Sequence, residues 1–251
     1  MTQEEKQDLQ QELCAALLAC DETKAADCIH RGADINAQDA NGYTPIYDAI
    51  DVGNVDAVKL IAKLGGDLNH EYVSSDDNLY NETPAIFAIK VGDHNTFMCL
   101  LELGVSPNNA NSAGVTLLMK ACAAMPYENF VSPLLQRGAD VHAKDKNGMT
   151  AFGIAAIDRE YCAWEIIPML LDAGANINEQ DENGETAVMA YAYGAGESPS
   201  YIKFFLERGA NPNLRNKEGN TALDIALEAN NGFAVEKLRQ YGGKQGKDLP
   251  V

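Results

Sequence analysis

Histidine and cysteine are the residues of this chain whose side chains most often act as general bases, nucleophiles or metal ligands. The four histidines lie in separate segments, and the six cysteines form no C-x-x-C pair and have no histidine at zinc-ligand spacing. We therefore interpret the histidines as helix-end or turn residues and the cysteines as reduced, mostly buried thiols. The histidines are His30, His70, His94 and His142, and the cysteines are Cys14, Cys20, Cys28, Cys99, Cys122 and Cys162.

Clustered carboxylates could form a cation site, and two groups of aspartates come close enough in the sequence to be considered. These are Asp76 with Asp77, and the set Asp140, Asp145 and Asp158. Neither group has the alternating ligands and central glycine of a calcium loop, which favours solvated turn carboxylates. The sequence also lacks a glycine-rich phosphate loop and a nucleophile placed beside a base. We predict no catalytic residue, no metal site and no cofactor.

The net charge limits which classes of binding partner are expected. The 37 acidic and 19 basic residues give a formal charge of −18. Phosphate binding needs clustered Lys and Arg, so neither a nucleic acid nor an anionic membrane surface is expected as a partner. No window has the roughly 18 apolar residues of a membrane span. An acidic surface could attract a basic protein, or could simply keep the protein soluble and monomeric, and we expect a monomer.

Two landmarks recur along the chain with nearly the same period. One is a glycine, at spacings of 33, 39, 34, 36, 35 and 33 residues, and the other is a threonine that opens a short apolar segment. Because the two landmarks keep step, the chain consists of internal repeats. The glycines are Gly32, Gly65, Gly104, Gly138, Gly174, Gly209 and Gly242, and the threonines are Thr44, Thr83, Thr116, Thr150, Thr186 and Thr221.

Each repeat predicts two helices. Threonine can cap the first helix, and Pro45 and Pro84 suit the first helical position, where a missing N–H is no loss. The glycine supplies the left-handed conformation that ends the second helix. Inner helices of about eight residues are too short to be stable alone, since isolated helices need roughly 12 to 15 residues. They must be stabilised by stacking on neighbouring repeats.

This pattern resembles the ankyrin family, whose 33-residue repeat combines a T-P-L-H-x-A motif, a β-turn and two antiparallel helices. The resemblance extends from about residue 9 to residue 242 and is best in ANGYTPIYDAIDVGNVDAVKLIAKLGGDLN and EGNTALDIALEANNGFAVEKLRQYGG. It implies an all-α ankyrin-repeat solenoid of about seven units with β-turn fingers. The motif histidine is absent, which puts its usual inter-repeat hydrogen bonds in doubt; its place is taken by Tyr47, Ile86, Met119, Gly153, Met189 and Asp224.

The repeats define one predicted ankyrin-repeat domain over residues 1–242. Residues 1–39 lack the motif and begin with a polar run, as expected of an amino-terminal capping repeat. Residues 243–251 are polar and glycine-rich, so we predict a flexible tail. The repeats that follow the cap are 40–72, 79–111, 112–145, 146–181, 182–216 and 217–242, with an inserted finger at 71–78.

The middle of the array is predicted to be its least regular part. Pro133 and Pro168 fall within predicted outer helices, which should be shortened, kinked or begin late, because proline removes a hydrogen bond and clashes with the preceding turn. Tyr191 takes a position that is alanine in the other repeats. We therefore expect the packing around it to be displaced.

The resemblance also implies which residues are exposed, because the fingers and inner helices of ankyrin repeats line a concave groove. Matching the repeats position by position selects residues beside each threonine and near the end of each inner helix. Trp164 is added as a possible interface aromatic, with packing against its own outer helix as the alternative. The expected anchors are Tyr43, Tyr47 and Tyr80, the acidic steering residues are Asp48, Asp51 and Glu82, and the remaining partner-binding positions are Lys90, Lys120, Met149, Asp158, Trp164, Glu185 and Tyr193.

The sequence therefore favours a protein-recognition module that binds a protein partner, expected to be basic, through the groove and fingers. Alternatives are binding through the inserted finger at 71–78, an inhibitor or immunity-type protein that neutralises a specific enzyme or toxin, and a self-assembling array. An enzyme is not expected, because no catalytic constellation is present. The reduced cysteines and the lack of a recognisable export signal favour a cytoplasmic protein. The resemblance also allows a protein that is delivered to a host cell without a cleavable signal.

Overall fold

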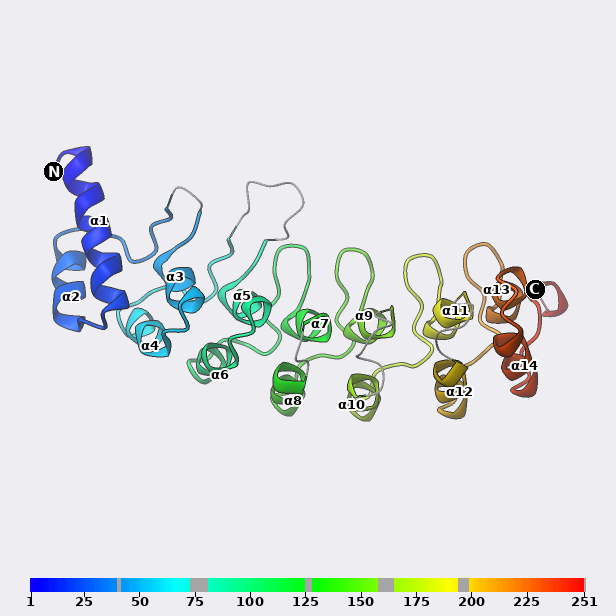
Figure 1. Ribbon diagram of the computed structural model, residues 1–251. Helices are drawn as coiled ribbons and strands as arrows, with labels where there is room; N and C mark the ends of the chain where they lie inside the picture. Colours follow the sequence, from blue (N-terminus) through cyan, green and yellow to red (C-terminus); the bar gives the residue numbers. More distant parts are fainter. Residues whose placement is uncertain (40–41, 73–80, 125–127, 158–164, 194–198, 251) are drawn as a thin grey trace. The chain divides into compact units, whose positions relative to one another are not determined.

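The computed structural model describes residues 1–39, 42–72, 81–124, 128–157, 165–193 and 199–250. Within these residues, fourteen α-helices form seven consecutive pairs, followed by one short 3₁₀ helix (Figure 1). The described residues contain two isolated β-bridges, Tyr72 with Glu82 and Ala110 with Thr116. This confirms the predicted all-α ankyrin-repeat architecture.

The helices of each pair are an inner helix followed by an outer one. The inner helices are α1 (Gln3–Leu18), α3 (Pro45–Asp51), α5 (Pro84–Val91), α7 (Leu117–Cys122), α9 (Ala151–Ile157), α11 (Ala187–Ala192) and α13 (Ala222–Glu228). The outer helices are α2 (Glu22–His30), α4 (Val55–Lys63), α6 (His94–Glu102), α8 (Glu128–Gln136), α10 (Ile166–Asp172), α12 (Pro199–Glu207) and α14 (Gly232–Gln240), and the 3₁₀ helix η1 is Gly246–Asp248.

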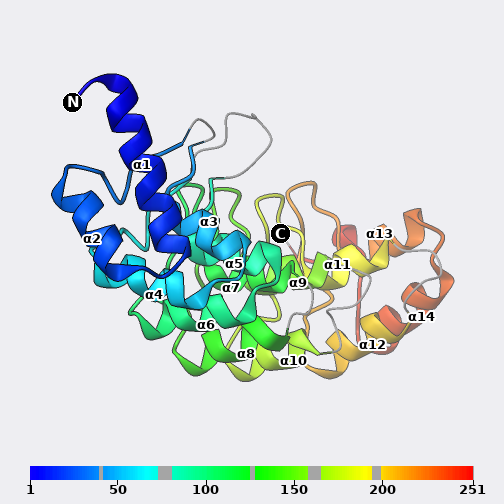
Figure 2. The ribbon, with the colours of Figure 1, turned by 60° about the vertical axis from the view of Figure 1, so that its left-hand side comes forward.

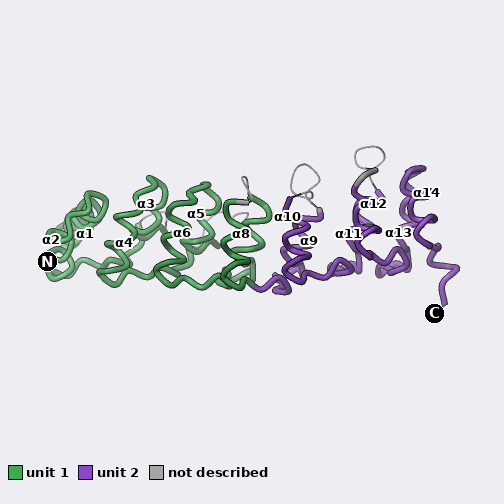
Figure 3. The backbone as a smooth tube through the Cα atoms, turned by 90° about the horizontal axis from the view of Figure 1, so that it is seen from below, with its two compact units in different colours: residues 1–139 green, residues 140–251 purple. Residues whose placement is uncertain are grey.

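The chain divides into two compact units, residues 1–139 and 140–251 (Figure 3). In the first unit, α3, α5 and α7 pack side by side in one row, and α4, α6 and α8 pack in a second row. In the second unit, α11 packs between α9 and α13, and α12 packs on α14. The single domain over residues 1–242 stays a prediction.

The predicted end signals act as expected in most repeats. The hydroxyls of Thr83, Thr116, Thr186 and Thr221 accept hydrogen bonds from the backbone N–H three residues on, at 3.2–3.5 Å. Thr44 opens α3 without such a bond. All seven landmark glycines have positive φ, from +79° to +103°. Glycine adopts this left-handed conformation without the steric cost of a Cβ, so it ends each outer helix.

In four inner helices, the third residue lies in the core between neighbouring repeats. Tyr47, Ile86, Met119 and Met189 occupy this position, and each is only 1% exposed. Their burial, together with that of the alanines later in each helix, stabilises helices of six to eight residues that could not persist alone. The absent motif histidine is therefore replaced mainly by apolar packing.

Asparagine side chains in the turn segments accept hydrogen bonds from backbone N–H groups of the next repeat. Asn36 Oδ1 accepts a hydrogen bond from Asp67 N at 2.8 Å, and Asn178 Oδ1 accepts one from Asn211 N at 2.6 Å. Each bond satisfies a backbone donor of the next turn. The register between these repeats is thus fixed by polar contacts as well as by the apolar core.

The flexible tail predicted for residues 243–251 is wrong for its described part. Arg215 donates hydrogen bonds to the carbonyl oxygens of Gly246 and Leu249, at 2.6 and 2.7 Å. Asp224 Oδ2 accepts a hydrogen bond from the N–H of Gly246 at 2.7 Å, and Gly246 is buried. The segment is too polar to form an apolar core, but hydrogen bonds to two charged side chains hold its backbone in place.

The two proline predictions have different outcomes. Helix α10 has seven residues and contains Pro168 in its first turn, which agrees with a late start. Helix α8 has nine residues with Pro133 inside, so the alternative of a helix shortened at Pro133 is wrong, while a kink or a late start stays a prediction. Tyr191 is buried and stacks on Tyr201 with ring centroids 4.8 Å apart, so an aromatic pair accommodates the residue that replaces alanine.

Asp224 should be the main polar support of the carboxy-terminal segment. Burial by itself raises the pKa of Asp224, but hydrogen bonds from Thr221, Gly246 and Gln245 outweigh it and lower the pKa below its ordinary value. A carboxylate with a lowered pKa stabilises the fold above the ordinary aspartate pKa of about 4, and this stabilisation is lost as pH falls through the lowered pKa. We predict that Asp224→Asn lowers the free energy of unfolding by about 1–3 kcal/mol at pH 7.

Chemical denaturation at pH 7 and at pH 3 checks this prediction. The difference between wild type and Asp224→Asn should be smaller at pH 3, because the wild-type carboxylate becomes protonated as pH falls. The control is Asp248→Asn, which makes the same chemical change at an exposed position of the same segment. Equal effects of the two substitutions at pH 7 would contradict the role of Asp224.

Candidate functional site

A large cleft lies in the first compact unit, between α1 and the turn that leads into α3. It has a volume of about 530 Å³. Helix α1 has sixteen residues, against six to eight in the other inner helices, and its amino-terminal half projects beyond α3 (Figure 2). This projection forms one wall of the cleft. We call it the amino-terminal cleft; it is lined by Gln3, Lys6, Gln7, Gln10, Gln11, Cys14, Ala37, Gln38, Asp39, Tyr43, Pro45 and Asp48.

A smaller pocket of about 260 Å³ adjoins the cleft and shares Tyr43 and Asp48 with it. Its other lining residues are Tyr47, Asp51 and Phe87. The ring of Tyr43 is half-buried and lies 5.9 Å from that of Phe87, centroid to centroid. The pocket therefore combines an aromatic wall with two carboxylates. Its residues come from the segment around α3 and from Phe87 in the inner helix of the next repeat, α5.

Tyr43 is held in place by a second aromatic residue. Its ring stacks on that of Tyr72 with centroids 4.3 Å apart. Tyr72 is itself fixed, because its N–H donates to the Glu82 carbonyl at 2.8 Å in an isolated β-bridge. The Tyr43 ring is thus oriented before any partner binds, which lowers the entropic cost of using it as an anchor.

The electrostatic environment of the cleft is negative. Burial raises the pKa of the Asp48 carboxyl, and the nearby carboxylates of Asp39 and Asp51 raise it further. The pKa of Tyr43 is raised by burial first, and also by Tyr72 and by surrounding carboxylates. Burial is the larger cause of both shifts, and the neighbouring carboxylates add a smaller repulsion between negative charges. A bound cation would relieve this repulsion.

Tyr47 is not an exposed anchor, so that part of the prediction is wrong. The side chain is 1% exposed, and its hydroxyl oxygen lies 2.5 Å from the His70 carbonyl oxygen and 2.6 Å from that of Glu82, either of which can accept its one proton. It also accepts a hydrogen bond from Tyr72 N at 3.1 Å. The phenol extends from the core into the base of the inserted finger, where it satisfies backbone groups. Burial raises its pKa, so it stays protonated.

Glu82 does not steer a partner as predicted, because it is 4% exposed. Its Oε2 accepts a hydrogen bond from Lys90 Nζ at 3.0 Å, and its Oε1 lies 3.7 Å from Lys120 Nζ. The buried carboxylate is therefore balanced by two lysines that also have partly exposed side chains. The predicted positions Lys90 and Lys120 form the outer part of this ion cluster.

Asp48 and Asp51 are exposed, as predicted, and Tyr43 is partly exposed. Tyr80, Asp158 and Trp164 lie outside the described residues. The structure thus brings Tyr43, Asp48 and Asp51 together in the cleft region. Their binding role stays a prediction.

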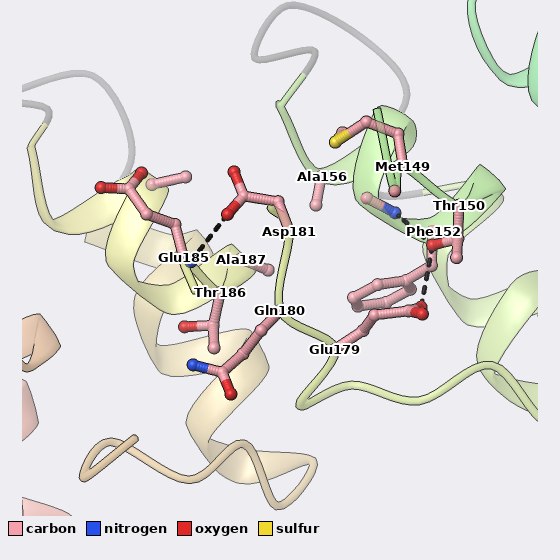
Figure 4. Close-up of a pocket in the computed structure, with 13 residues that line it drawn as sticks. Met149, Thr150, Phe152, Ala156, Glu179, Gln180, Asp181, Glu185, Thr186 and Ala187 are labelled. Atoms are coloured by element: carbon pink, nitrogen blue, oxygen red, sulfur yellow. Dashed lines mark hydrogen bonds between the residues drawn. The ribbon is translucent and has the colours of Figure 1, made fainter. Parts of the chain in front are cut away.

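The remaining predicted positions lie in the second compact unit, around a smaller cavity. Met149 and Glu185 both line this cavity, which has a volume of about 60 Å³ and lies between α9, α11 and the turn that connects their repeats (Figure 4). Tyr193 follows α11 and is 50% exposed. Sequence matching therefore placed Met149 and Glu185 at one pocket without predicting that a pocket exists.

Sequence reasoning missed the polar wall of the amino-terminal cleft. Gln3, Gln7 and Gln11 follow each other at intervals of four residues, a spacing that places them on one face of a helix. We interpreted this run only as the polar face of a capping repeat. The spacing was visible in the sequence, but the cleft depends on α1 projecting past α3, and only the structure shows this.

Comparison with known proteins settles the family. Residues 68–145 and 152–248 match the family described as ankyrin repeats (3 copies), and these two segments make up more than half of the chain. The chain belongs to the ankyrin-repeat family. Ankyrin repeats are in general protein–protein interaction modules.

Several curated proteins are similar to this ankyrin-repeat chain. A putative palmitoyltransferase ZDHHC13 of Danio rerio is 25% identical over 224 residues, which cover 86% of this chain and 32% of the relative. Ankyrin repeat and SOCS box protein 6 of Pongo abelii and of Homo sapiens are each 32% identical over 139 residues, which cover 52% of this chain and 32% of the relative. The chain spans about a third of the length of these relatives.

Metal-binding clusters and membrane-spanning helices are absent from the described part of the chain. No group of three or more His, Cys, Asp or Glu side chains there is arranged to hold a metal ion. No helix in that part is long and apolar enough to cross a membrane.

Tyr47→Phe tests the structural role of the buried phenol. The substitution removes the Tyr47 hydroxyl from the His70 carbonyl, and it removes one of two contacts from the Glu82 carbonyl and the Tyr72 N–H, which still bond each other. We predict a loss of about 1–3 kcal/mol in the free energy of unfolding, measured by urea denaturation. Tyr193→Phe removes a half-exposed hydroxyl and should change stability by less than about 0.5 kcal/mol. If the two substitutions cost the same, the Tyr47 hydroxyl is not a structural link.

Proposed function

We propose that this ankyrin-repeat protein is a recognition module that binds a basic segment of a protein partner in the amino-terminal cleft. The proposal rests on one observation: a cleft of about 530 Å³ adjoins an aromatic pocket that is also lined by Asp48 and Asp51. We also expect the protein to act as a monomer. Binding along the whole concave groove of the family stays a wider prediction.

The size and lining of the cleft suit a peptide segment. Protein binding pockets for drug-sized ligands have volumes of roughly 300–1,000 Å³, a range that includes this cleft. Its α1 wall is lined by glutamines, whose amides can both donate to and accept from a peptide backbone. Its opposite wall ends at the fixed ring of Tyr43. This arrangement offers hydrogen bonds along one side and an apolar surface on the other.

The charges favour a partner with lysine or arginine. Asp39, Asp48 and Asp51 line the cleft and its adjoining pocket, where Lys6 is the basic residue among the lining side chains. The face of an aromatic ring next to carboxylates also attracts cations. The formal charge of −18 adds a long-range attraction that accelerates encounter with a basic partner and weakens with salt.

The similarity to a palmitoyltransferase does not carry enzyme activity to this chain. Palmitoyl transfer belongs to the name of a relative of which the chain covers 32%. The sequence predicts no catalytic constellation in this chain. We therefore propose recognition without catalysis.

Site-specific photocrosslinking tests the proposal. A photoreactive phenylalanine analogue at position 43 should capture a protein partner from native lysate, because this ring lines both pockets. The matched control carries the analogue at Tyr241, which is 40% exposed at the end of an outer helix. Capture only from position 43 supports the cleft; equal capture from both positions, or capture only from 241, contradicts it.

Charge reversal then tests the chemistry of recognition. With the captured partner purified, we predict that Asp48→Lys combined with Asp51→Lys weakens binding at least about tenfold at low salt, which corresponds to about 1.4 kcal/mol. Raising the salt concentration should reduce this difference. Asp56→Lys reverses an exposed charge on the outer helix α4 and should change affinity less than about twofold. Unchanged binding by the double variant would show that the cleft carboxylates do not take part.

A further inference from the structure

The cavity in the second compact unit exists because one inner helix lacks a side chain that the others have. The third residue is buried in α3, α5, α7 and α11, where it is Tyr47, Ile86, Met119 and Met189. It is the partly exposed Asp224 in α13, whereas in α9 it is Gly153, which has no side chain. The space beside Gly153 is the cavity of about 60 Å³ that opens between α9 and α11 (Figure 4). We call it the Gly153 pocket.

The backbone does not require glycine at this position. Gly153 lies within α9 and does not have a positive φ. Its N–H donates a hydrogen bond to the Thr150 hydroxyl oxygen at 3.1 Å. A Cβ here would lie 3.3 Å from Met149 Cε and 3.6 Å from Thr150 Oγ1. Met149 Cε is the flexible end of a side chain and can shift. Glycine in a helix is less favourable than alanine, so this residue leaves both the helix and the packing less stable than they could be.

The inside of the pocket is apolar. Phe152, Ala156, Ala187 and Ala190 line it, and Met149 covers one side. An engineered cavity of about 150 Å³ takes up benzene, so a cavity less than half that size is too small for an aromatic ring. A short aliphatic side chain such as that of valine or alanine fits better.

The rim of the pocket is acidic and preorganised. Asp181 Oδ1 accepts hydrogen bonds from Asn183 N and Glu185 N, both at 2.8 Å, which fixes the turn at the rim. Glu179 accepts a hydrogen bond from the Thr150 hydroxyl at 2.8 Å and lies 3.4 Å from Lys144 Nζ. This ion pair leaves the carboxylates of Asp181 and Glu185 as the excess negative charge of the rim.

Tyr193, which follows α11, is a partly exposed aromatic residue of the same unit. Its phenol is half-exposed, and its pKa is raised by burial first and then by Glu185, Glu228 and Glu218. Three carboxylates therefore act on the same exposed ring. A cation beside it would gain from the carboxylates and from the ring face together.

We infer that the Gly153 pocket is a second binding site, which takes a small aliphatic side chain of a partner segment that has lysine or arginine beside it. The apolar interior selects the aliphatic group, and Asp181 and Glu185 at the rim select the adjacent cation. The missing side chain at Gly153 gives the protein a site at the expense of stability. This inference rests on the proposed function, because the occupant is a segment of protein, but it uses only residues of the second compact unit.

The test uses capped tripeptides as probes. Binding of acetyl-Lys-Val-Lys-amide is followed by the NMR signals of the Met149 methyl and the Ala187 methyl in the full chain. We expect its affinity to be at least fivefold higher than those of the Lys-Gly-Lys, Lys-Phe-Lys and Glu-Val-Glu tripeptides. Equal affinities for the Val, Gly and Phe tripeptides would overturn the apolar pocket, and equal affinities for the Lys and Glu tripeptides would overturn the cation site.

Gly153→Met fills the pocket with the residue found at the same position in α7 and α11. We predict that it weakens binding of the Lys-Val-Lys tripeptide at least tenfold, without lowering the melting temperature. Gly153→Ala, which fills the pocket only in part, should raise the melting temperature and weaken binding less. If Gly153→Met folds and binds as well as wild type, the cavity is only a packing defect. If Gly153→Met does not fold, Gly153→Ala decides, and unchanged binding with raised stability would overturn the inference.

The outcome can be separated from that of the proposed function. Capture of a partner at position 43 with no tripeptide binding at the Gly153 pocket would overturn this inference and leave the amino-terminal cleft supported. Tripeptide binding that Gly153→Met abolishes, without capture at position 43, would support this inference and contradict the cleft.

Discussion

Burial of the inner helices against their neighbours is the interaction on which the rest of this structure depends. Apart from α1, each inner helix has six to eight residues and cannot persist alone in water. The side chain at the third position, such as Tyr47 or Met119, is therefore placed between repeats and loses its exposure. Residues with this packing role cannot contact a partner. For this reason Tyr47 is buried, although it matches a position that the family resemblance implies to be exposed.

The same constraint explains where binding groups remain. In α3, the fourth and seventh residues, Asp48 and Asp51, point away from the stacked row and stay exposed. Tyr43 precedes the helix and is only partly covered, because it lies on Tyr72 from the finger of the next repeat. Exposed carboxylates and a fixed aromatic ring thus meet at the edge of the core. Gly153 is the converse case, in which a core position without a side chain opens a pocket in the row itself.

Much of the fold could be predicted, because its signals are local. Threonine caps and left-handed glycines act within one turn of chain, and their recurrence gives the number and order of helices. The prediction was wrong where distant residues decide the outcome. Glu82 has the sequence setting of an exposed turn residue, but Lys90 and Lys120 stabilise it in the interior. The segment after Gly242 has the composition of a flexible tail, yet Arg215 and Asp224 hold it.

The sequence by itself determined the family, the all-helical repeat architecture and the acidic charge, because periodicity, caps and composition are properties of the chain alone. It also placed Asp48, Asp51 and Tyr43 close to one another, since they share one repeat. Only the tertiary structure decided that Tyr47 is a core residue, that the glutamines of α1 form the wall of a cleft, and that Gly153 leaves a cavity. Each of these depends on which surfaces of different repeats come into contact, and no single segment contains that information.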